Sequence, residues 1–359
     1  MEEEEFNIMK KSTLLVGILL IIFTVFGFII SGADQEKKSP PENNFYENSL
    51  HYTNRGLEYW YSKEQGGLER ITNIPFSKLP CAGCHVRSCD TCHRKDVAGK
   101  PAYSLEPARA QQVCQDCHAI ESLEKARKNP EDPTVDVHFK KGMKCLDCHT
   151  AKEVHGDGTP YNSMQQPGAL DVRCEKCHPQ LSAGPSHEVH KGRVDCNACH
   201  VRELTTCFNC HFDTRVNQGK SVSIPLKNLN FLINSNGQVT LGNFHTYVFE
   251  NKTMITFAPG FPHAVTKDGR KCDECHNTRI IEDIKKNRLY PVVFEKGEVK
   301  NITGIVPVLD GMKWNLVYLN YENEKWVLID RPAEPLINYS GYCRPLTPEQ
   351  FAKLEKPGK

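Results

Sequence analysis

The sequence predicts an irregular fold of short α-helices and coil that leads into a β-rich C-terminal region. Only 39% of the 359 residues are hydrophobic, which is a low share for a chain of this length that closes a side-chain core. Seventeen residues are cysteine and fifteen are histidine. Strand patterns with turn signals begin only after about residue 213. We therefore expect something other than aliphatic side chains to fill much of the interior.

The cysteine count and the charge exclude two classes of protein. Seventeen cysteines are too many for an ordinary cytosolic enzyme, because heavy cysteine use is typical of oxidising compartments. The formal charge is +1, and no basic stripe or block of like charge interrupts the sequence. We therefore expect no nucleic-acid partner.

The N-terminus predicts export. An apolar run covers residues 14–30, follows Met9-Lys10-Lys11 and precedes the small-residue site Ser31-Gly32-Ala33. This is the order of a secretory signal peptide that starts at Met9. Cleavage after Ala33 is the favoured interpretation. An uncleaved membrane anchor is the alternative, because seventeen apolar residues are marginal for a membrane span. Both interpretations place the rest of the chain outside the cytoplasmic membrane, at the cell surface or in the extracellular space.

Sixteen of the cysteines form eight CxxC pairs, and a histidine follows each pair directly. The pairs are Cys81 and Cys84, Cys89 and Cys92, Cys114 and Cys117, Cys145 and Cys148, Cys174 and Cys177, Cys196 and Cys199, Cys207 and Cys210, and Cys272 and Cys275. The histidines that follow them are His85, His93, His118, His149, His178, His200, His211 and His276.

The CxxCH spacing suits covalent haem attachment. Two thiols three positions apart on a helical turn reach the two vinyl groups of one haem, and the next residue directs its imidazole at the iron. Zinc knuckles also use CxxC, but they need four ligands per metal and no histidine after every pair. Disulfides would suit an exported chain, but they leave all eight histidines unexplained.

With these motifs the chain resembles the multihaem c-type cytochromes, specifically an octahaem member. The resemblance covers Cys81 to His276. It implies eight covalently attached c-type haems and an irregular, haem-dominated multihaem cytochrome c fold, with short α-helices and coil around a haem stack. The motif is specific for haem attachment and does not say what the haems are used for.

The histidines are one short of the number that eight haems can use. Eight haems have sixteen axial positions, and fifteen histidines minus the eight proximal ones leave seven for the distal positions. The predicted distal ligands are His51, His138, His155, His187, His190, His245 and His263. Seven haems would then be bis-histidine, and one would not.

The spare histidines mostly lie close to a motif in the sequence. His138, His187, His190 and His263 precede motifs by a few residues, and His155 follows one. His187 and His190 are three apart, so on a helix they share a face and could ligate two neighbouring haems. His51 and His245 lie further from any motif.

The eighth distal position is the main functional question. It could be empty, held by water, or filled by Lys, Met or the unpaired Cys343. A bis-histidine iron is saturated, whereas an open iron can bind a substrate. The chain also resembles the octahaem tetrathionate reductases in haem count and in the CHTxxxxHGDG stretch that begins at Cys148. That resemblance implies a lysine-held active haem, and no corresponding lysine can be identified in this sequence.

Five regions are expected along the chain. They are 1–33, a signal peptide or membrane anchor; 34–75, an N-terminal arm with a helix; 76–212, a heptahaem region; 213–345, a β-rich region with the eighth haem; and 346–359, a tail. The helix of the arm is expected from His51 to about Glu64. Seven motifs occupy residues 81–211, so few residues remain per haem and we expect the haems to be the core there.

The β-rich region is predicted from turn signals between apolar runs. A hairpin is expected at residues 224–249, with Asn236-Gly237 as its turn. Residues 290–330 are expected to hold further strands, with turns at Lys296-Gly297 and Glu322-Asn323. The region could cap the haem stack or present a sheet edge to another subunit.

Three functions fit these observations. The first is an electron conduit, alone or as a homopolymer, because the chain resembles in part the archaeal extracellular cytochrome nanowire subunits; His51 would then be a candidate ligand to a haem of the next subunit. The second is a reductase or oxidase of small nitrogen or sulfur compounds at the one haem that is not bis-histidine. The third is an anchored adaptor that takes electrons from a membrane quinol oxidase. The expected partners are other cytochromes or redox proteins, and copies of the same chain if it polymerises.

Overall fold

The computed structural model describes residues 45–83, 85–118, 135–181, 184–204, 206–260 and 263–356, which belong to one compact unit that begins at Phe45. Cys84 and the predicted signal or anchor segment lie outside the described residues. Among the described residues, no helix is long and apolar enough to cross a membrane.

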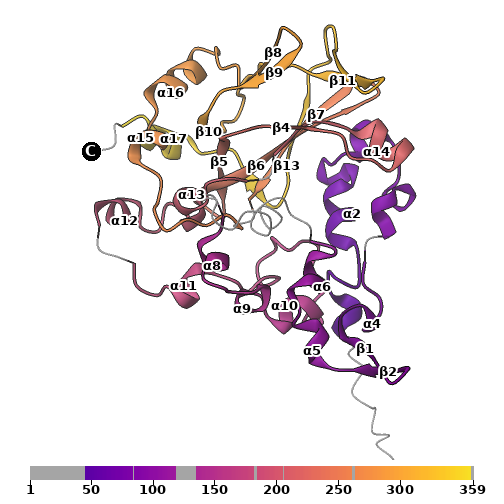
Figure 1. Cartoon of the computed structure of the whole chain (residues 1–359). Coiled ribbons are helices and arrows are strands. Elements are labelled where there is room, and N and C mark those ends of the chain that lie inside the picture. Colours follow the sequence, from indigo (N-terminus) through magenta and orange to yellow (C-terminus); the bar gives the residue numbers. More distant parts are fainter. Residues whose placement is uncertain are drawn as a thin grey trace, which may run out of the picture. The chain divides into compact units, whose positions relative to one another are not determined.

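Eight strands form one mixed sheet, which dominates the second half of the chain (Figure 1). Its centre is an antiparallel meander of β5, β6 and β7, flanked by the parallel pairs β3–β6, β10–β5 and β13–β7. The short strands β4 and β14 pair antiparallel with β3 and β5. The bounds are β3 Cys207–His211, β4 Ile224–Pro225, β5 Leu229–Ser235, β6 Gln238–Phe249, β7 Lys252–Pro259, β10 Gly304–Pro307, β13 Leu336–Tyr339 and β14 Cys343–Arg344.

The predicted turns lie close to where the sequence placed them. Asn236 and Gly237 join β5 to β6, and both have positive φ, as a two-residue hairpin turn requires. Lys296 and Gly297 join β8 (Val292–Glu295) to β9 (Glu298–Asn301). The turn between β11 (Leu319–Glu322) and β12 (Lys325–Leu328) is at residues 323–324, one position later than predicted. A further hairpin, not predicted, joins β1 (Arg94–Val97) to β2 (Lys100–Tyr103).

The sheet has a conventional side-chain core. Phe231, Phe244 and Phe257 are fully buried, and the rings of Phe231 and Phe244 stack with centroids 4.4 Å apart. Trp314 packs against all three phenylalanines. Aromatic and aliphatic burial of this kind stabilises the folded state.

The predicted fold class is therefore wrong. A fold dominated by haems, with an irregular chain around them, would not contain an eight-stranded sheet over an aromatic core. The prediction relied on the low share of hydrophobic residues in the whole chain. That share is an average over a polar region rich in motifs and an apolar sheet, so it did not indicate that the sheet has a core of its own. The sheet also includes β3, which the prediction had assigned to the helix-and-coil part of the chain.

The helices are short, and many of them begin at a motif cysteine. In the first part of the chain they are η1 Phe45–Asn48, α2 Arg55–Tyr61, η2 Lys63–Gln65, α3 Glu69–Thr72, η3 Phe76–Lys78, η4 Pro80–Gly83, α4 Asp90–His93, α5 Leu105–Ala108, α6 Gln111–Gln115, α8 Val137–Lys140, α9 Cys145–Cys148 and α10 Ala151–His155. The later ones are α11 Cys174–Cys177, α12 Pro185–His190, α13 Cys196–His200, α14 Phe212–Gln218, α15 Cys272–Cys275, α16 Thr278–Lys285 and α17 Pro348–Leu354. The helix expected from His51 to about Glu64 is divided into α2 and η2, and Gly66 ends it in the left-handed conformation.

The helix-rich part and the sheet meet at the later motifs. α13 contacts β6, and α15 and α16 contact β10. Figure 1 shows the helices α4 to α13 gathered together, with α13 next to β5 and β6. The sheet thereby supports two of the motif helices, α13 and α15.

Candidate haem sites

Six of the eight motifs adopt a helical turn. These motifs lie at α4, α6, α9, α11, α13 and α15. In four of them both cysteines lie in the helix, whereas Cys89 precedes α4 and Cys117 follows α6. Residues next to a motif can stabilise its helical turn. At α13, for example, the Asp195 side chain accepts a hydrogen bond from the Asn197 N–H and so caps the helix. A helical turn places the two thiols of a motif on one side, as thioether bonds to one haem require.

Six of the seven spare histidines lie opposite a motif histidine. The pairs, with the distances between their ring centroids, are His51 and His118 at 6.1 Å, His155 and His93 at 5.9 Å, His138 and His178 at 6.2 Å, His263 and His149 at 6.2 Å, His187 and His200 at 6.3 Å, and His190 and His276 at 6.4 Å. The structure therefore gives each of these six predicted distal ligands a specific partner.

The separation of the paired rings fits one metal ion between two imidazoles. A metal–nitrogen bond of about 2 Å on each side, plus about 1 Å from each nitrogen to its ring centre, places two axial imidazole centroids about 6 Å apart. All six pairs have this spacing. The residues of these six sites therefore fit a bis-histidine haem.

The hydrogen bonds of the Nδ1 atoms leave the Nε2 atoms available to iron. A carbonyl oxygen only accepts, so an Nδ1 bonded to it carries the hydrogen and Nε2 keeps its lone pair. Five paired histidines donate in this way: His93 to Ser104 O, His155 to Ala151 O, His190 to Ser186 O, His200 to Thr266 O and His276 to Leu354 O. Second-shell bonds of this kind orient histidine ligands in metalloproteins.

Two further paired histidines donate to buried carboxylates instead. His149 Nδ1 lies 2.8 Å from Glu153 Oε2, and His138 Nδ1 lies 3.0 Å from Asp136 Oδ1. Burial alone would raise the pKa of Glu153, but bonds from His149 and from backbone N–H groups outweigh it and hold this pKa below its usual value. Neither carboxylate was predicted from the sequence. Glu153 follows Thr150 by three residues, and this capping-box spacing was the available signal.

Burial favours the neutral form of several ligands. It lowers the pKa of His51, His118 and His263, and neighbouring histidines lower it further. A neutral imidazole is the form that binds a metal. These three rings are therefore suited to ligation before any haem is bound.

The six paired sites follow one another in space in the order of their motifs. From the His93 site to the His118 site, Cys92 lies near Cys114 and Cys117, and from there to the His149 site, Cys114 hydrogen-bonds to Cys145. Cys148 of the His149 site lies near Cys174 and Cys177 of the His178 site, where Cys174 hydrogen-bonds to Cys196 of the His200 site. Cys199 of the His200 site lies near Cys272 and Cys275 of the His276 site. Each contact joins one site to the next. The resulting path runs through the sites of His93, His118, His149, His178, His200 and His276.

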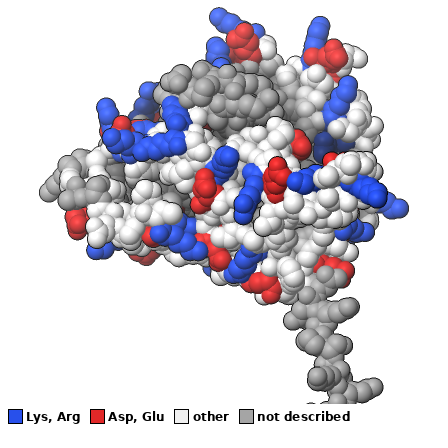
Figure 2. Space-filling model, turned by 60° about the horizontal axis from the view of Figure 1, so that its bottom comes forward, with Lys and Arg blue, Asp and Glu red and all other residues white. Residues whose placement is uncertain are grey.

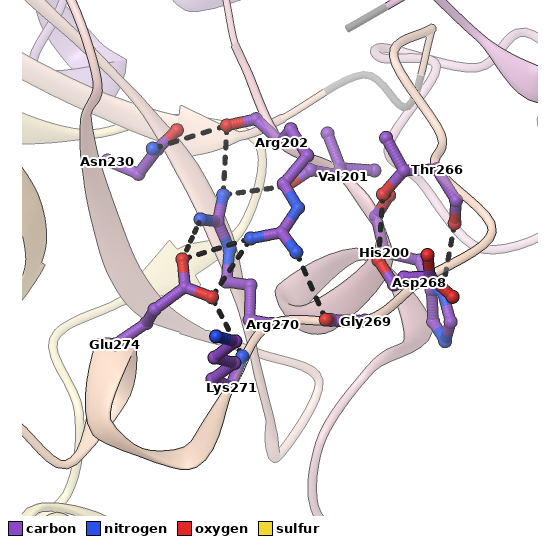
Figure 3. Close-up of polar contacts among 10 residues, drawn as sticks. All are labelled: His200, Val201, Arg202, Asn230, Thr266, Asp268, Gly269, Arg270, Lys271 and Glu274. Atoms are coloured by element: carbon purple, nitrogen blue, oxygen red, sulfur yellow. Dashed lines mark hydrogen bonds and ion pairs between the residues drawn. The ribbon is translucent and has the colours of Figure 1, made fainter. Parts of the chain in front are cut away.

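An ionic cluster of Arg202, Arg270 and Glu274, of which only Arg270 is buried, joins the last two sites of this path (Figure 3). Arg202 follows the motif of His200, and its Nη1 atom lies 2.9 Å from Glu274, inside the motif of His276. Arg270 also pairs with Glu274 and donates to the carbonyl oxygens of Val201 and Arg202. The Arg270 side chain is only 6% exposed. The two motifs are therefore held in a fixed relation by charge-assisted bonds.

Replacement of Arg270 should destabilise this junction strongly. We expect Arg270→Gln to lower the free energy of unfolding by about 2 to 3 kcal/mol, because it removes one of the two guanidinium groups bonded to Glu274 and the guanidinium donor to the carbonyl oxygens of Val201 and Arg202. Urea denaturation followed by far-UV circular dichroism measures this. Lys286→Gln is the matched control: its ion pair with Glu282 is exposed, and its loss should cost at most about 0.5 kcal/mol. Equal effects of the two variants would contradict the role given to Arg270.

The first motif differs from the six paired ones. Cys81 lies in the 3-10 helix η4, and Cys84 lies outside the described residues. Within the described part of the chain, no histidine ring faces His85. The Val86 N–H donates to the backbone oxygen of His51, so this motif lies beside the histidine that faces His118.

The seventh motif is part of the sheet. Its residues form β3, and pairing with β6 places Cys207 opposite His245, Cys210 opposite Tyr247 and His211 opposite Val248. The register shifts at a bulge between Cys207 and Cys210, so simple alternation does not run through the motif. Directly paired residues point to the same face, so the two cysteines, His245 and Tyr247 share one face while His211 points to the other. The short helix or coil predicted for this motif is therefore wrong.

Buried side chains hold the seventh motif in the strand. Phe208 and Asn209 are fully buried. Asn209 exchanges two hydrogen bonds with the backbone of Leu319, at 2.6 and 2.9 Å. In the six paired motifs the residues between the cysteines are mostly exposed. The apolar Phe208 was the one signal in the sequence for this difference.

His245 is not brought to a proximal histidine among the described residues. Its Nδ1 accepts a hydrogen bond from the Cys207 N–H at 3.2 Å, and burial lowers the pKa of His245 to about 4. On the other face, the ring of Tyr321 lies 6.3 Å from that of His211. Cys343 is 3% exposed within the sheet core, and its thiol donates to the oxygen of Phe257. The axial role of His245 stays a prediction.

Comparisons with known proteins agree with the chemistry of these motifs. No protein-family model and no solved structure matches the chain. Among curated proteins, the chain is similar to "Cytochrome c-552" of Haemophilus ducreyi, with 26% identity over 160 residues. The match covers 39% of this chain and 32% of the relative, so the chain spans about a third of the relative's length. Together with the motifs, this likeness supports a c-type cytochrome that binds haem covalently.

Proposed function

We propose that this c-type cytochrome is an exported octahaem electron conduit. The observation that carries the proposal is the ordered row of six histidine pairs, each with the spacing of two axial ligands. A haem bound at each pair supplies a reversible one-electron couple. The pairs fill both axial positions, so these sites exclude substrate and favour electron transfer over catalysis.

The protein's own residues order and tune the path. Short motif helices place neighbouring attachment cysteines side by side, and the cluster of Arg202, Arg270 and Glu274 fixes the last two sites. Carbonyl oxygens and two carboxylates orient the imidazoles. Rigid placement of this kind keeps the distances between redox centres constant.

We propose that the motifs of His85 and His211 carry the remaining two haems. His245 is the last spare histidine, and its position opposite Cys207 in the sheet, on the face that both motif cysteines share, supports a role at the seventh motif. One of the two haems then lacks a histidine as its second ligand, because only fifteen histidines serve sixteen positions. The residues that complete these two sites include Tyr247 or Tyr321, whose rings lie near Cys210 and His211.

The proposed partners are other cytochromes or redox proteins, and copies of the same chain in an extracellular filament. On the face drawn in Figure 2, basic and acidic side chains lie interspersed among uncharged ones. Such a mixed surface suits transient contacts with redox partners rather than binding to nucleic acid. The apolar segment at residues 14–30 is proposed to direct export, either as a signal peptide or as a retained membrane anchor.

The alternative function is a reductase or oxidase of small nitrogen or sulfur compounds. The observation that favours it is the position of His85, whose ring faces no histidine within the described residues. An iron held there on one side only could bind a small molecule.

Ligand binding to the reduced protein separates the two functions. We expect carbon monoxide to bind at most the two haems outside the six pairs, and we expect no rapid reoxidation by nitrite, hydroxylamine or tetrathionate. Optical spectra after chemical reduction measure both. Binding to most of the haems would overturn the conduit, and fast reoxidation by one of these compounds would establish the enzyme. Negative-stain microscopy tests the filament, which strictly monomeric particles would contradict.

A further inference from the structure

Two neighbouring sites of the row differ from three of the other four in the group that accepts the Nδ1 hydrogen of a paired histidine. At these sites the acceptors are the carboxylates of Glu153, bonded to His149, and Asp136, bonded to His138. At the sites of His93, His200 and His276, the acceptors are backbone carbonyl oxygens. A carbonyl is neutral, whereas a carboxylate can place a full negative charge next to the ligand.

Both carboxylates are buried and surrounded by donors. The side chains of Glu153 and Asp136 are 3% and 5% exposed. Glu153 also accepts hydrogen bonds from the backbone N–H groups of Asp171 and Val172. Asp136 accepts from the backbone N–H groups of His138 and Val265. Because N–H groups only donate, these environments suit carboxylates that act as acceptors on both oxygens.

Asp136 also connects the two sites. Its Oδ1 atom accepts from the His138 ring, while its Oδ2 atom accepts from the Val265 N–H at 2.9 Å. Val265 follows His263 by two residues, and His263 is the histidine that faces His149. One carboxylate therefore orients an axial ligand of one site and holds the segment that carries an axial ligand of the next.

We infer that Glu153 and Asp136 give the two central haems of the row, held by His149–His263 and His138–His178, the lowest reduction potentials of the six. The inference rests on the proposed haem relay. A buried negative charge bonded to an imidazole makes the ligand more basic and stabilises ferric over ferrous iron. The effect is large where solvent is excluded, because the local dielectric constant is low.

The position of these sites gives the inference a functional consequence. Cys148 lies beside Cys174 and Cys177, so the two sites are neighbours, with two paired sites before them and two after them. The row then has its lowest potentials in the middle. In a reductive titration, the two central haems are reduced last and the outer four are reduced earlier.

Three variants test this in the full-length holoprotein. Glu153→Gln and Asp136→Asn each remove one negative charge and keep the size of the side chain. Asp147→Asn is the matched control, because Asp147 lies in the same motif as His149 but is exposed and accepts from the Lys144 N–H instead of an imidazole. Spectroelectrochemical titration gives the potentials, and intact mass gives the haem content of each variant.

We expect Glu153→Gln and Asp136→Asn each to shift one low-potential component of the titration to higher potential, and Asp147→Asn to leave the curve unchanged. Unshifted curves for both test variants at full haem content would overturn the inference, as would an equal shift in the control. If one of the two test variants fails to retain haem, the titration curve of the other variant tests the inference. The low-spin signal of the oxidised wild-type protein is a separate readout: its absence would overturn the relay itself, whereas its presence with unshifted potentials overturns only the role of the carboxylates.

Discussion

His155→Ala should convert one haem from low-spin to high-spin and open it to carbon monoxide. His155 lies on α10 with its ring 5.9 Å from that of His93, and its Nδ1 donates to Ala151 O. Alanine cannot replace the lost nitrogen ligand, and no other spare histidine faces His93 in the described residues. Optical and electron paramagnetic resonance spectra of the oxidised protein measure the spin state, and the carbon monoxide spectrum of the reduced protein measures the open site.

The control for this variant is a neighbour on the same helix. Lys152→Ala removes an exposed side chain that bonds to Asp157, Asp171 and the Gly168 oxygen but to no paired histidine among the described residues, so its spectra should match those of the wild type. A fully low-spin His155→Ala variant with complete haem content would show that His155 is not an axial ligand. Such a result would remove the first site of the row.

Phe231→Ala should lower the free energy of unfolding of the sheet by about 3 to 5 kcal/mol. Phe231 is fully buried, stacks on Phe244 at 4.4 Å and contacts Phe257 and Trp314 at 5.7 and 6.0 Å between ring centroids. Truncation leaves a cavity that flat aromatic neighbours cannot fill without leaving their own contacts. The shift of the urea midpoint, followed by far-UV circular dichroism at constant slope, measures the loss.

Val327→Ala is the comparison for the core variant. Val327 lies in the hairpin strand β12 and is 44% exposed, so its truncation should cost no more than about 0.5 kcal/mol. The urea midpoint of Phe231→Ala could instead lie as close to that of the wild type as the midpoint of Val327→Ala. This result would mean that the haems alone, and not the sheet core, stabilise this part of the chain.

The sequence predicted the local features that short motifs encode. The CxxCH spacing identified the six motif turns, and the turns at Asn236-Gly237 and Lys296-Gly297 were predicted where they occur. Both depend on residues that are adjacent in the chain, and this is why one sequence sufficed. The histidine count predicted seven distal ligands; six of these histidines face a motif histidine, and their role as ligands stays a prediction.

Features that depend on distant residues could not be predicted. His263 and His149 are 114 residues apart in the chain, and nothing in the sequence around either residue indicates that the two rings face each other. The strand β3 forms because β6 lies beside it and because Asn209 bonds to Leu319, 110 residues later. Arg270 appeared as an ordinary charged residue, and only the fold shows that it is buried against Glu274.

The fold class was mistaken for a similar reason. Composition is an average over the whole chain, and this chain joins a polar region, which haems are expected to fill, to a sheet with its own aromatic core. Phe231 and Phe244 lie in strands that the sequence did predict, whereas β7, which carries Phe257, was not predicted. The convergence of the three rings on Trp314 required the sheet order. Strand prediction without topology therefore could not show that a separate core exists.

The most direct test of the central claim is a count of bis-histidine haems in the oxidised wild-type protein. Near-infrared magnetic circular dichroism reports the axial ligands of low-spin haems, and intact mass reports how many haems are attached. The six histidine pairs predict at least six bis-histidine haems per chain. A count below six in protein that carries its full haem content would contradict the account.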